Sequence, residues 1–528
     1  MNLLRYAALL LAVLSWCCCV PLSAFAQGDG KAPAAQPKSV PTPADAVGWA
    51  LADVAQIPAS ERPFMRYLWI PPWGDAKWLA ALNFTVNTAA SQSATLHLGT
   101  PVANGWLIRY DLSQLVPDDG QLTRLLEVWS GMAVDDPYFH VPSDNTGVNI
   151  AVVAPHLPQD QALALSGLQL APGTIYRADW FIVLALSTIE DDKGRYYDMR
   201  QVELNPKAAS GMDVWLSKRG VFVGTSNALG GEKRAALLES LVTGKPRRVD
   251  VFGALTGPGH IGSITRDVTD GRINADNHPI RALLDFPDEG REIIVTMPNG
   301  MLDYLLANAK GEIIREAPPE LVRDHTIPAP QTARLQPAIS CIRCHGDEQS
   351  VGWKRVNNDV ESILGSELDI FADLGSGLSS RQVRDKLASL YAAKKLDHPD
   401  GYLGMARRIH AEAVAITARG VDFGKSKKGI VTLVAEQVSS IYEDYKWNKV
   451  TPQRAALELG YDFTGIQSRE NPLTFVVGEP SPAELQVDPI AALLRLKKGG
   501  RPVTRRDFEV IYGDLAVRAE SLRKAKGE

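Results

Sequence analysis

The chain has 528 residues, of which 45% are hydrophobic and 22% charged, and its formal net charge is −5. This composition is that of an ordinary globular protein, and the length suits roughly two to four domains. Nucleic-acid-binding proteins are usually basic, so we expect no nucleic-acid partner.

The first 26 residues have the pattern of a secretory signal peptide. Arg5 supplies the positive charge, residues 7–22 form a short apolar run, and Ala24-Phe25-Ala26 is a cleavage site of small residues. The alternative is an uncleaved membrane anchor, which is disfavoured because the run is short for a bilayer span. We therefore expect cleavage near Gln27, no transmembrane segment after cleavage, and a periplasmic location.

Residues 27–45 are rich in Pro and Ala, which predicts a flexible linker. Residues 46–335 then have the mixed patterns of an α/β domain. Tryptophans are concentrated early in this region, and such residues more often form hydrophobic core than a sugar-binding surface. They are Trp69, Trp73, Trp78, Trp106 and Trp129.

Three segments of this region have readable patterns. Residues 106–112 alternate in the manner of a strand with polar ends. Residues 180–186 are a continuous apolar run, which suits a buried strand. Residues 232–242 carry leucines at helical spacing, so we expect a helix there.

The clearest β pattern precedes the cysteines. Residues 292–297 predict a strand, and Pro298-Asn299-Gly300 predicts a turn. Residues 301–307 return as a second strand, Ala309-Lys310-Gly311 turns again, and residues 312–314 make a third. Together they predict an antiparallel meander.

The cysteines are informative because so few remain after export. Of the five in the chain, Cys17, Cys18 and Cys19 leave with the signal peptide. Only Cys341 and Cys344 remain, so the mature protein has no disulfide framework.

These two cysteines belong to the C-x-x-C-H pattern typical of covalent c-type haem attachment, with His345 as its last residue. One helical turn places the thiols of Cys341 and Cys344 on the same face, where both can bond the vinyl groups of one porphyrin edge. His345 then serves as the proximal iron ligand. The predicted cofactor is one covalent haem c.

Three other interpretations were weighed. A structural zinc site needs further ligands at knuckle spacing, and the chain has no second cysteine pair. A simple disulfide would not require His345. A thioredoxin-like redox pair needs a surrounding βαβ pattern, whereas the run after Gly346 is polar and helix-forming.

The sixth iron ligand is left open by the sequence. Met405 is the tentative choice, because it is the methionine downstream of the motif at a separation usual for a small cytochrome c. Met297, His398, His410 and an open position are the alternatives.

Residues 336–424 are expected to form a mostly helical, cytochrome c-like haem domain. Ser380 is expected to cap a helix that carries Leu387 and Tyr391, and residues 404–417 predict another helix. In the helical C-terminal region, residues 425–528, Thr451-Pro452 starts a helix and Thr504 with Asp507 resembles a capping box. An apolar stripe at helical spacing comprises Val431, Val434, Val438, Ile441 and Tyr445.

Residues 290–301, 304–306, 316–324 and 339–345 resemble a known family, the exported single-haem cytochrome c-domain proteins of planctomycetes and some proteobacteria. Shorter similar runs are residues 66–68, 109–112, 177–180, 455–460 and 504–509. The resemblance implies haem binding and electron transfer, with no settled substrate. In the family a leucine usually stands at the position of Met297, which disfavours Met297 as a ligand.

The sequence therefore predicts an α+β protein that acts as a periplasmic electron carrier with an unidentified redox partner protein. Two other functions stay open: a haem enzyme or gas sensor with an open iron position, and an interaction scaffold in which haem is structural. No catalytic residue is predicted.

Overall fold

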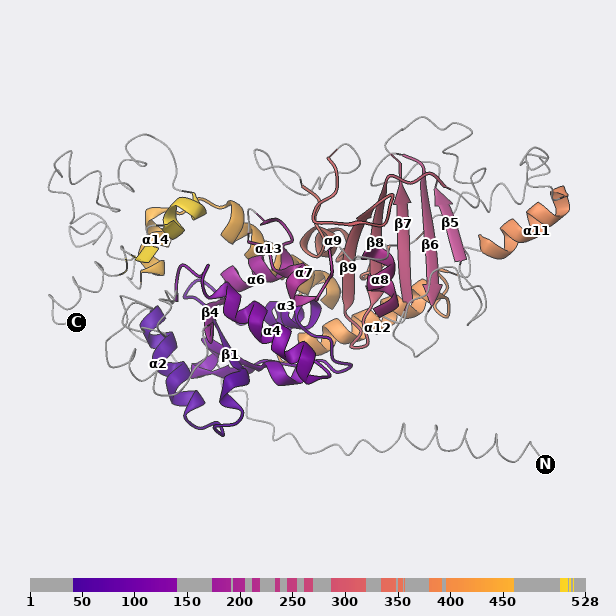
Figure 1. The fold of residues 1–528 in the computed structure, drawn as a ribbon. Helices are drawn as coiled ribbons and strands as arrows, with labels where there is room; N and C mark the ends of the chain where they lie inside the picture. The colour runs from indigo at the N-terminus through magenta and orange to yellow at the C-terminus, as the bar shows by residue number, and fades with distance from the viewer. Residues whose placement is uncertain are drawn as a thin grey trace, which may run out of the picture. The chain divides into compact units, whose positions relative to one another are not determined.

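Two β-sheets and the helices around them make this an α+β protein (Figure 1). The computed structural model describes residues 41–139, 173–190, 193–204, 211–218, 233–237, 245–253, 261–268, 286–319, 334–347, 350–354, 356, 379–391, 396–459, 504–510, 512–513 and 516. The predicted signal peptide lies outside these residues.

The first sheet has four strands in the order β2-β3-β1-β4 and is mixed. Strand β1 (Met65–Trp69) runs antiparallel to β3 (Leu107–Asp111) and parallel to β4 (Ile175–Arg177). Strand β2 (Thr100–Val102) completes the edge. All five residues of β1 are buried, as expected of a central strand covered on both faces. The predicted strand at residues 106–112 is confirmed as β3.

The second sheet has six strands, and each pairs antiparallel with its neighbour along the chain. The predicted meander is therefore confirmed, and three further strands precede it. In chain order the strands are β5 (Lys233–Leu237), β6 (Arg247–Gly253), β7 (Ile261–Asp267), β8 (Gly290–Thr296), β9 (Leu302–Asn308) and β10 (Ile313–Ile314).

Glycine makes both predicted turns of this meander possible. Gly300, between β8 and β9, has a φ of 83°, and Gly311, between β9 and β10, has a φ of 77°. These angles lie in the left-handed region, which glycine adopts without the steric cost that a Cβ atom brings. The turns fix the register in which Glu292 of β8 stands opposite Leu306 of β9.

The predicted strand at residues 180–186 is wrong, because these residues lie in helix α6 (Ala178–Leu186). Every residue of α6 is buried, so the helix needs no polar face and its sequence shows no helical period. A continuous apolar run of this length is compatible with either structure, and only the surroundings decide between them.

The predicted helix at residues 232–242 is also wrong over its described part. Residues 233–237 form the edge strand β5, which pairs with β6 along its whole length. Its Ala-rich and Leu-containing sequence favours a helix locally, but the ladder offered by β6 outweighs that preference.

The helices begin and end close to where the sequence predicts them. The cap of α11 is Ser379 rather than Ser380: the Ser379 hydroxyl accepts from the Gln382 amide at 3.3 Å. Thr504 and Asp507 make the predicted reciprocal capping contacts at 3.3 and 3.1 Å. The helices other than α6 are α2 (Pro43–Val54), α3 (Trp78–Ala89), α4 (Asp119–Met132), α7 (Tyr196–Met199), α8 (Gly211–Lys218), α9 (Ile339–His345), α11 (Ser380–Leu390), α12 (Tyr402–Thr417), α13 (Ile430–Trp447) and α14 (Pro452–Glu458).

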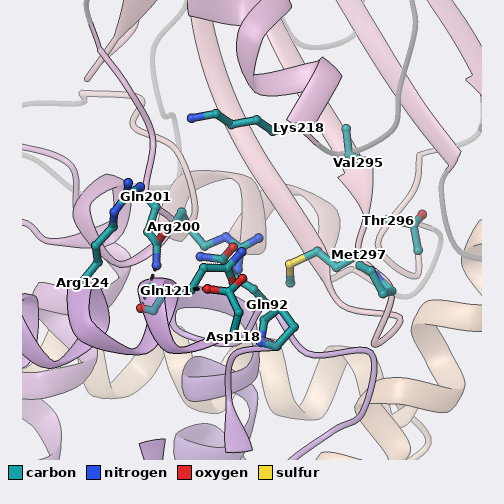
Figure 2. A pocket seen from close by; sticks show the side chains of 13 residues that line it. Gln92, Asp118, Gln121, Arg124, Arg200, Gln201, Lys218, Val295, Thr296 and Met297 are labelled. Carbon is teal, nitrogen blue, oxygen red and sulfur yellow. Dashed lines mark hydrogen bonds between the residues drawn. The ribbon is translucent and has the colours of Figure 1, made fainter. Parts of the chain in front are cut away.

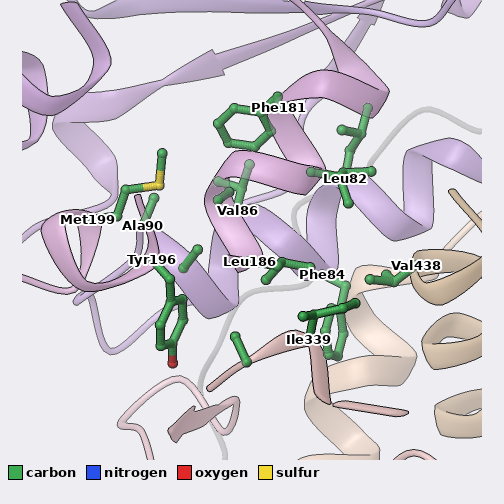
Figure 3. Packing of buried hydrophobic residues seen from close by; sticks show 14 of the residues in the cluster. Leu82, Phe84, Val86, Ala90, Phe181, Leu186, Tyr196, Met199, Ile339 and Val438 are labelled. Carbon is green, nitrogen blue, oxygen red and sulfur yellow. The ribbon is translucent and has the colours of Figure 1, made fainter. Parts of the chain in front are cut away.

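One hydrophobic core joins the N-terminal and C-terminal elements. Helix α13 contacts α3, α6, α9 and α12, and the whole predicted stripe from Val431 to Tyr445 is buried. Figure 3 shows Phe84 of α3 beside Ile339 of α9, with Val438 of α13 nearby. The cysteine helix α9 is therefore anchored in the core.

The early tryptophans are largely core residues, as predicted. Trp69, Trp78 and Trp129 are buried, and Trp73 and Trp106 are half-buried. Helix α2 begins at Pro43, so the last residues of the predicted linker are helical. None of the described helices is long and apolar enough to cross a bilayer.

Candidate functional site

Helix α9 carries the two cysteines and the histidine of the motif. Because three residues make nearly one helical turn, Cys341 and Cys344 lie on the same side of α9, as the sequence predicts. The two cysteines are not joined by a disulfide; Cys341 is buried and Cys344 half-buried. The first residues of α9, from Ile339 to Ile342, are buried in the core.

The imidazole of His345 is oriented by the backbone of a following loop. Its Nδ1 lies 3.1 Å from the carbonyl oxygen of Gly352. The Gly352 amide in turn donates to the His345 carbonyl at 2.7 Å. Because Nδ1 donates its proton to a carbonyl, the lone pair available to a metal is on Nε2, the arrangement usual for metal-binding histidines.

Gly352 has to be glycine for this loop to approach so closely. Its φ is 84°, and a Cβ atom there would lie 2.4 Å from Cδ2 of His410. That separation is far inside van der Waals contact, so a side chain at position 352 would displace either the loop or His410. The orientation of His345 therefore depends on this glycine.

Glu292, on the central strand β8, faces the motif helix. Its Oε1 lies 3.6 Å from Nε2 of His345 and accepts from the Cys341 thiol at 3.4 Å. Burial by itself would raise the pKa of this carboxyl. The hydrogen bond and charge of His345, then Arg247 and then Cys341, lower its pKa to about 2. A negative charge thus stands beside the motif at neutral pH.

Glu292 is not among the site residues predicted from the sequence, although one feature of the sequence points to it. It is a charged residue within the strand run Glu292-Ile293-Ile294-Val295. A carboxylate in the central part of a strand, with a β-strand on either side, needs a partner to be tolerated. The partners, Cys341 and His345, lie about 50 residues further along the chain, where no local pattern points to them.

Arg343, between the two cysteines, is buried against helix α13. Only 4% of its side chain is exposed, and its Nε lies 3.3 Å from Glu443 of α13. Its guanidinium lies over the rings of Trp447, at 4.7 Å, and Tyr442, at 5.2 Å. The helix is therefore held on α13 by a cation–π contact as well as by apolar packing.

Trp447 and Glu443 also line a cleft of about 620 Å³. Trp73, Trp78 and Asp444 lie on its walls. The cleft therefore begins at side chains that contact Arg343, which lies two residues after Cys341 and one before Cys344.

Of the candidate sixth ligands, His410 lies next to Gly352, the residue whose carbonyl contacts His345. It is buried on α12, and its Nδ1 lies 3.2 Å from the carbonyl oxygen of Gly300. Burial is the main cause that lowers its pKa to about 4; the hydrogen bond to Gly300 acts in the raising direction and the nearby charge of His345 in the lowering direction. His410 lies next to Gly352, whose carbonyl oxygen faces Nδ1 of His345. A metal would bind the other ring nitrogen of His345, Nε2.

Met405 lies on the same helix as His410 but faces elsewhere. Five residues turn an α-helix by about 500°, so Met405 points roughly 140° away from His410 around the helix axis. It is half-buried and packs against the hydrophobic core. As an iron ligand Met405 stays a prediction.

The other two alternatives are Met297, after the end of β8, and His398, in a loop. Met297 follows the end of β8, five positions after Glu292, which is about 16 Å along the strand and on its opposite face. His398 is an exposed loop residue beside Asp400, at 3.6 Å. As iron ligands both stay predictions.

The donor set of α9 fits the attachment of a haem. It offers two thiols on one helix face, and an imidazole whose Nδ1 is engaged and whose Nε2 is the coordinating nitrogen. Glu292 is the group that a ligand on Nε2 has to displace. The comparisons with protein families, curated proteins and solved structures found no match to this chain.

Proposed function

We propose that this protein is an exported c-type cytochrome that transfers electrons to or from a partner protein in the periplasm. One haem is held covalently by Cys341 and Cys344, and His345 is the proximal ligand. Residues 336–424 form the cytochrome c-like haem domain of this proposal, and residues 425–528 its helical C-terminal extension. The haem supplies one-electron chemistry when it is bound.

The observation that carries the proposal is the orientation of His345. The C-x-x-C-H spacing alone is also compatible with a disulfide between the two cysteines, which would not involve the histidine. Here the histidine has its Nδ1 held at 3.1 Å by the carbonyl of a glycine that tolerates no side chain. Such a contact selects the tautomer that a metal ligand requires, and a disulfide has no use for it.

The chain's own residues set the conditions of electron transfer. Gly352 fixes the ring of His345, and Arg343 ties the helix to α13. Glu292 brings a negative charge to the motif. A carboxylate near a metal centre stabilises its more positive, oxidised state, so Glu292 should lower the reduction potential.

A haem enzyme or gas sensor with an open sixth position is the second candidate. It is supported by the surroundings of Nε2. The described side chain that faces this nitrogen is Glu292, whereas His410 lies on the Nδ1 side and Met405 points about 140° away from His410 around α12. A carboxylate is not among the usual axial ligands of electron-transfer haems.

Mass spectrometry of the denatured protein, made in a host that matures c-type cytochromes, tests the attachment. We expect the mass of one haem on the wild-type chain and none on the double variant Cys341→Ser/Cys344→Ser. The single variant His345→Ala should keep the covalent mass but lose the native spectrum, because only the imidazole ligand is removed. A wild-type chain without added mass would overturn the proposal.

The visible spectrum of the same sample separates the two candidates. A low-spin, six-coordinate ferrous spectrum that carbon monoxide leaves unchanged supports the electron carrier. A high-spin spectrum that changes with carbon monoxide supports the enzyme or sensor. A covalent haem that physiological reductants cannot reduce would contradict both and leave a structural haem.

A further inference from the structure

A pocket of about 640 Å³ lies at the end of β8, away from the motif (Figure 2). It is lined by the first turn of α4, by Arg200 and Gln201 after α7, and by the residues that end β8. Thr296, at this end of the strand, is about 13 Å along β8 from Glu292. The volume is within the range of small-molecule sites.

Polar atoms without partners line this pocket. Arg200 is 4% exposed; its Nη2 donates to Asp303 at 2.7 Å and its Nη1 to the carbonyl of Ser91. Three buried polar atoms of the lining have no hydrogen-bond partner among the described residues. They are Nε of Arg200, Nε2 of Gln92 and Oε1 of Gln121. A buried donor left unpaired is unfavourable, so the two donors, Nε of Arg200 and Nε2 of Gln92, favour a ligand that accepts their hydrogen bonds.

The charged side chains of the lining favour an anion. Arg124, Arg200 and Lys218 are positive, and Asp118 is the acidic residue among them. The Asp118 carboxylate accepts an amide of the first turn of α4 at 2.8 Å, so helix capping already offsets part of its charge. Lys218 is paired with Glu203 at the exposed rim. Arg200 and Lys218 are thus already paired with carboxylates, and Arg124 is the positive side chain of the lining with no ion pair among the described residues.

One wall of the pocket is apolar. Val295, Met297 and Pro298 form it at the end of β8. In Figure 2 the side chains of Arg200 and Gln92 are turned toward the space in front of Met297. A ligand here thus meets hydrogen-bond donors on one side and carbon on the other.

We propose that this pocket binds a small organic anion. Its carboxylate or phosphate oxygens accept hydrogen bonds from Arg200 and Gln92, and its carbon portion lies against Met297. The site goes beyond the proposed electron transfer and needs no haem, so it stands or falls independently of the attachment test.

Isothermal titration calorimetry on the full mature chain tests this site, with butyrate, inorganic phosphate and the neutral analogue butyramide as probes at one ionic strength. We expect saturable binding of an anionic probe and none of butyramide. The double variant Arg124→Gln/Lys218→Gln should weaken anion binding about tenfold, because two positive lining charges are lost. Asp118→Asn should strengthen it about threefold, since asparagine still caps α4 but carries no charge.

Arg408→Gln is the matched control, because Arg408 is an exposed arginine of α12 outside the pocket lining. This variant should bind the anionic probes with the same affinity as the wild-type protein. Tighter binding of phosphate than butyrate assigns the ligand class to phosphates, and the reverse assigns it to carboxylates. Butyramide binding as tightly as butyrate, no saturable binding of either anion, or equal affinities in all variants would overturn the proposal.

Discussion

At the scale of single residues, the orientation of His345 depends on Gly352. The carbonyl of this glycine accepts from His345 Nδ1, and its Cα packs against His410. The motif thus relies on a position that carries no functional group of its own.

Gly352→Ala should destabilise the fold more than the same change at Gly420. Both glycines have positive φ, 84° and 79°, so both substitutions have the same backbone cost. At Gly420 the added Cβ meets nothing within 4 Å, whereas at Gly352 it meets His410 at 2.4 Å. We expect Gly352→Ala to lose about 1–3 kcal/mol more, measured by urea unfolding. Equal losses would show that the contact with His410 relaxes freely.

At the scale of elements, the motif helix is held by the core rather than by its own sequence. Helix α9 is only seven residues long, too short to be stable alone in water. Ile339 is fully buried at its first turn, next to Phe84 (Figure 3). Packing against α3 and α13 therefore supplies the stability that positions Cys341 and His345.

Ile339→Ala should cost about 2–4 kcal/mol, because it removes buried methyl and methylene groups and leaves a cavity. Val510→Ala is the control: Val510 is 80% exposed, so its truncation should change stability by less than about 0.5 kcal/mol. Urea unfolding followed by tryptophan fluorescence measures both. A loss at Ile339 as small as that at Val510 would contradict the anchoring of α9.

At the scale of the whole molecule, a buried ion-pair network joins distant parts of the chain. Glu458 of α14 accepts from Arg177 of β4 at 2.6 Å and from Arg505 at 2.7 Å. Arg454 adds a third contact at 2.9 Å. Burial raises the pKa of Glu458, but the three arginines outweigh it and lower the pKa to about 2.

Glu458→Gln should destabilise the protein by about 3–5 kcal/mol at neutral pH, because buried arginines lose their partner. A carboxyl whose pKa is lowered by folding stabilises the fold at pH values above its ordinary pKa near 4.5. This stabilisation is lost as the pH falls toward 2. The difference from wild type should therefore shrink on acidification over that range, in urea titrations at several pH values.

Glu436→Gln is the control for this prediction, since Glu436 pairs with Lys428 and both side chains are about half exposed. Its loss should stay below about 1 kcal/mol and change little with pH. A pH-independent loss at Glu458, or one no larger than that at Glu436, would contradict the role assigned to the network.

The sequence by itself determined the features that depend on residues close together in the chain. The C-x-x-C-H spacing on a helix follows from the rise and turn of that helix. The meander around β8 and β9 follows from alternating side chains and from the glycine at position 300, and the cap at Thr504 follows from a partner three residues away. Each of these is decided by local geometry.

The tertiary structure decided what depends on distant partners. Glu292 meets Cys341 and His345 only because β8 and α9 pack together, and Arg343 is buried only because α13 lies over it. The apolar run of α6 became a helix because the core surrounds it on every side. Burial and long-range pairing arise from the whole chain at once, so no window of sequence contains them.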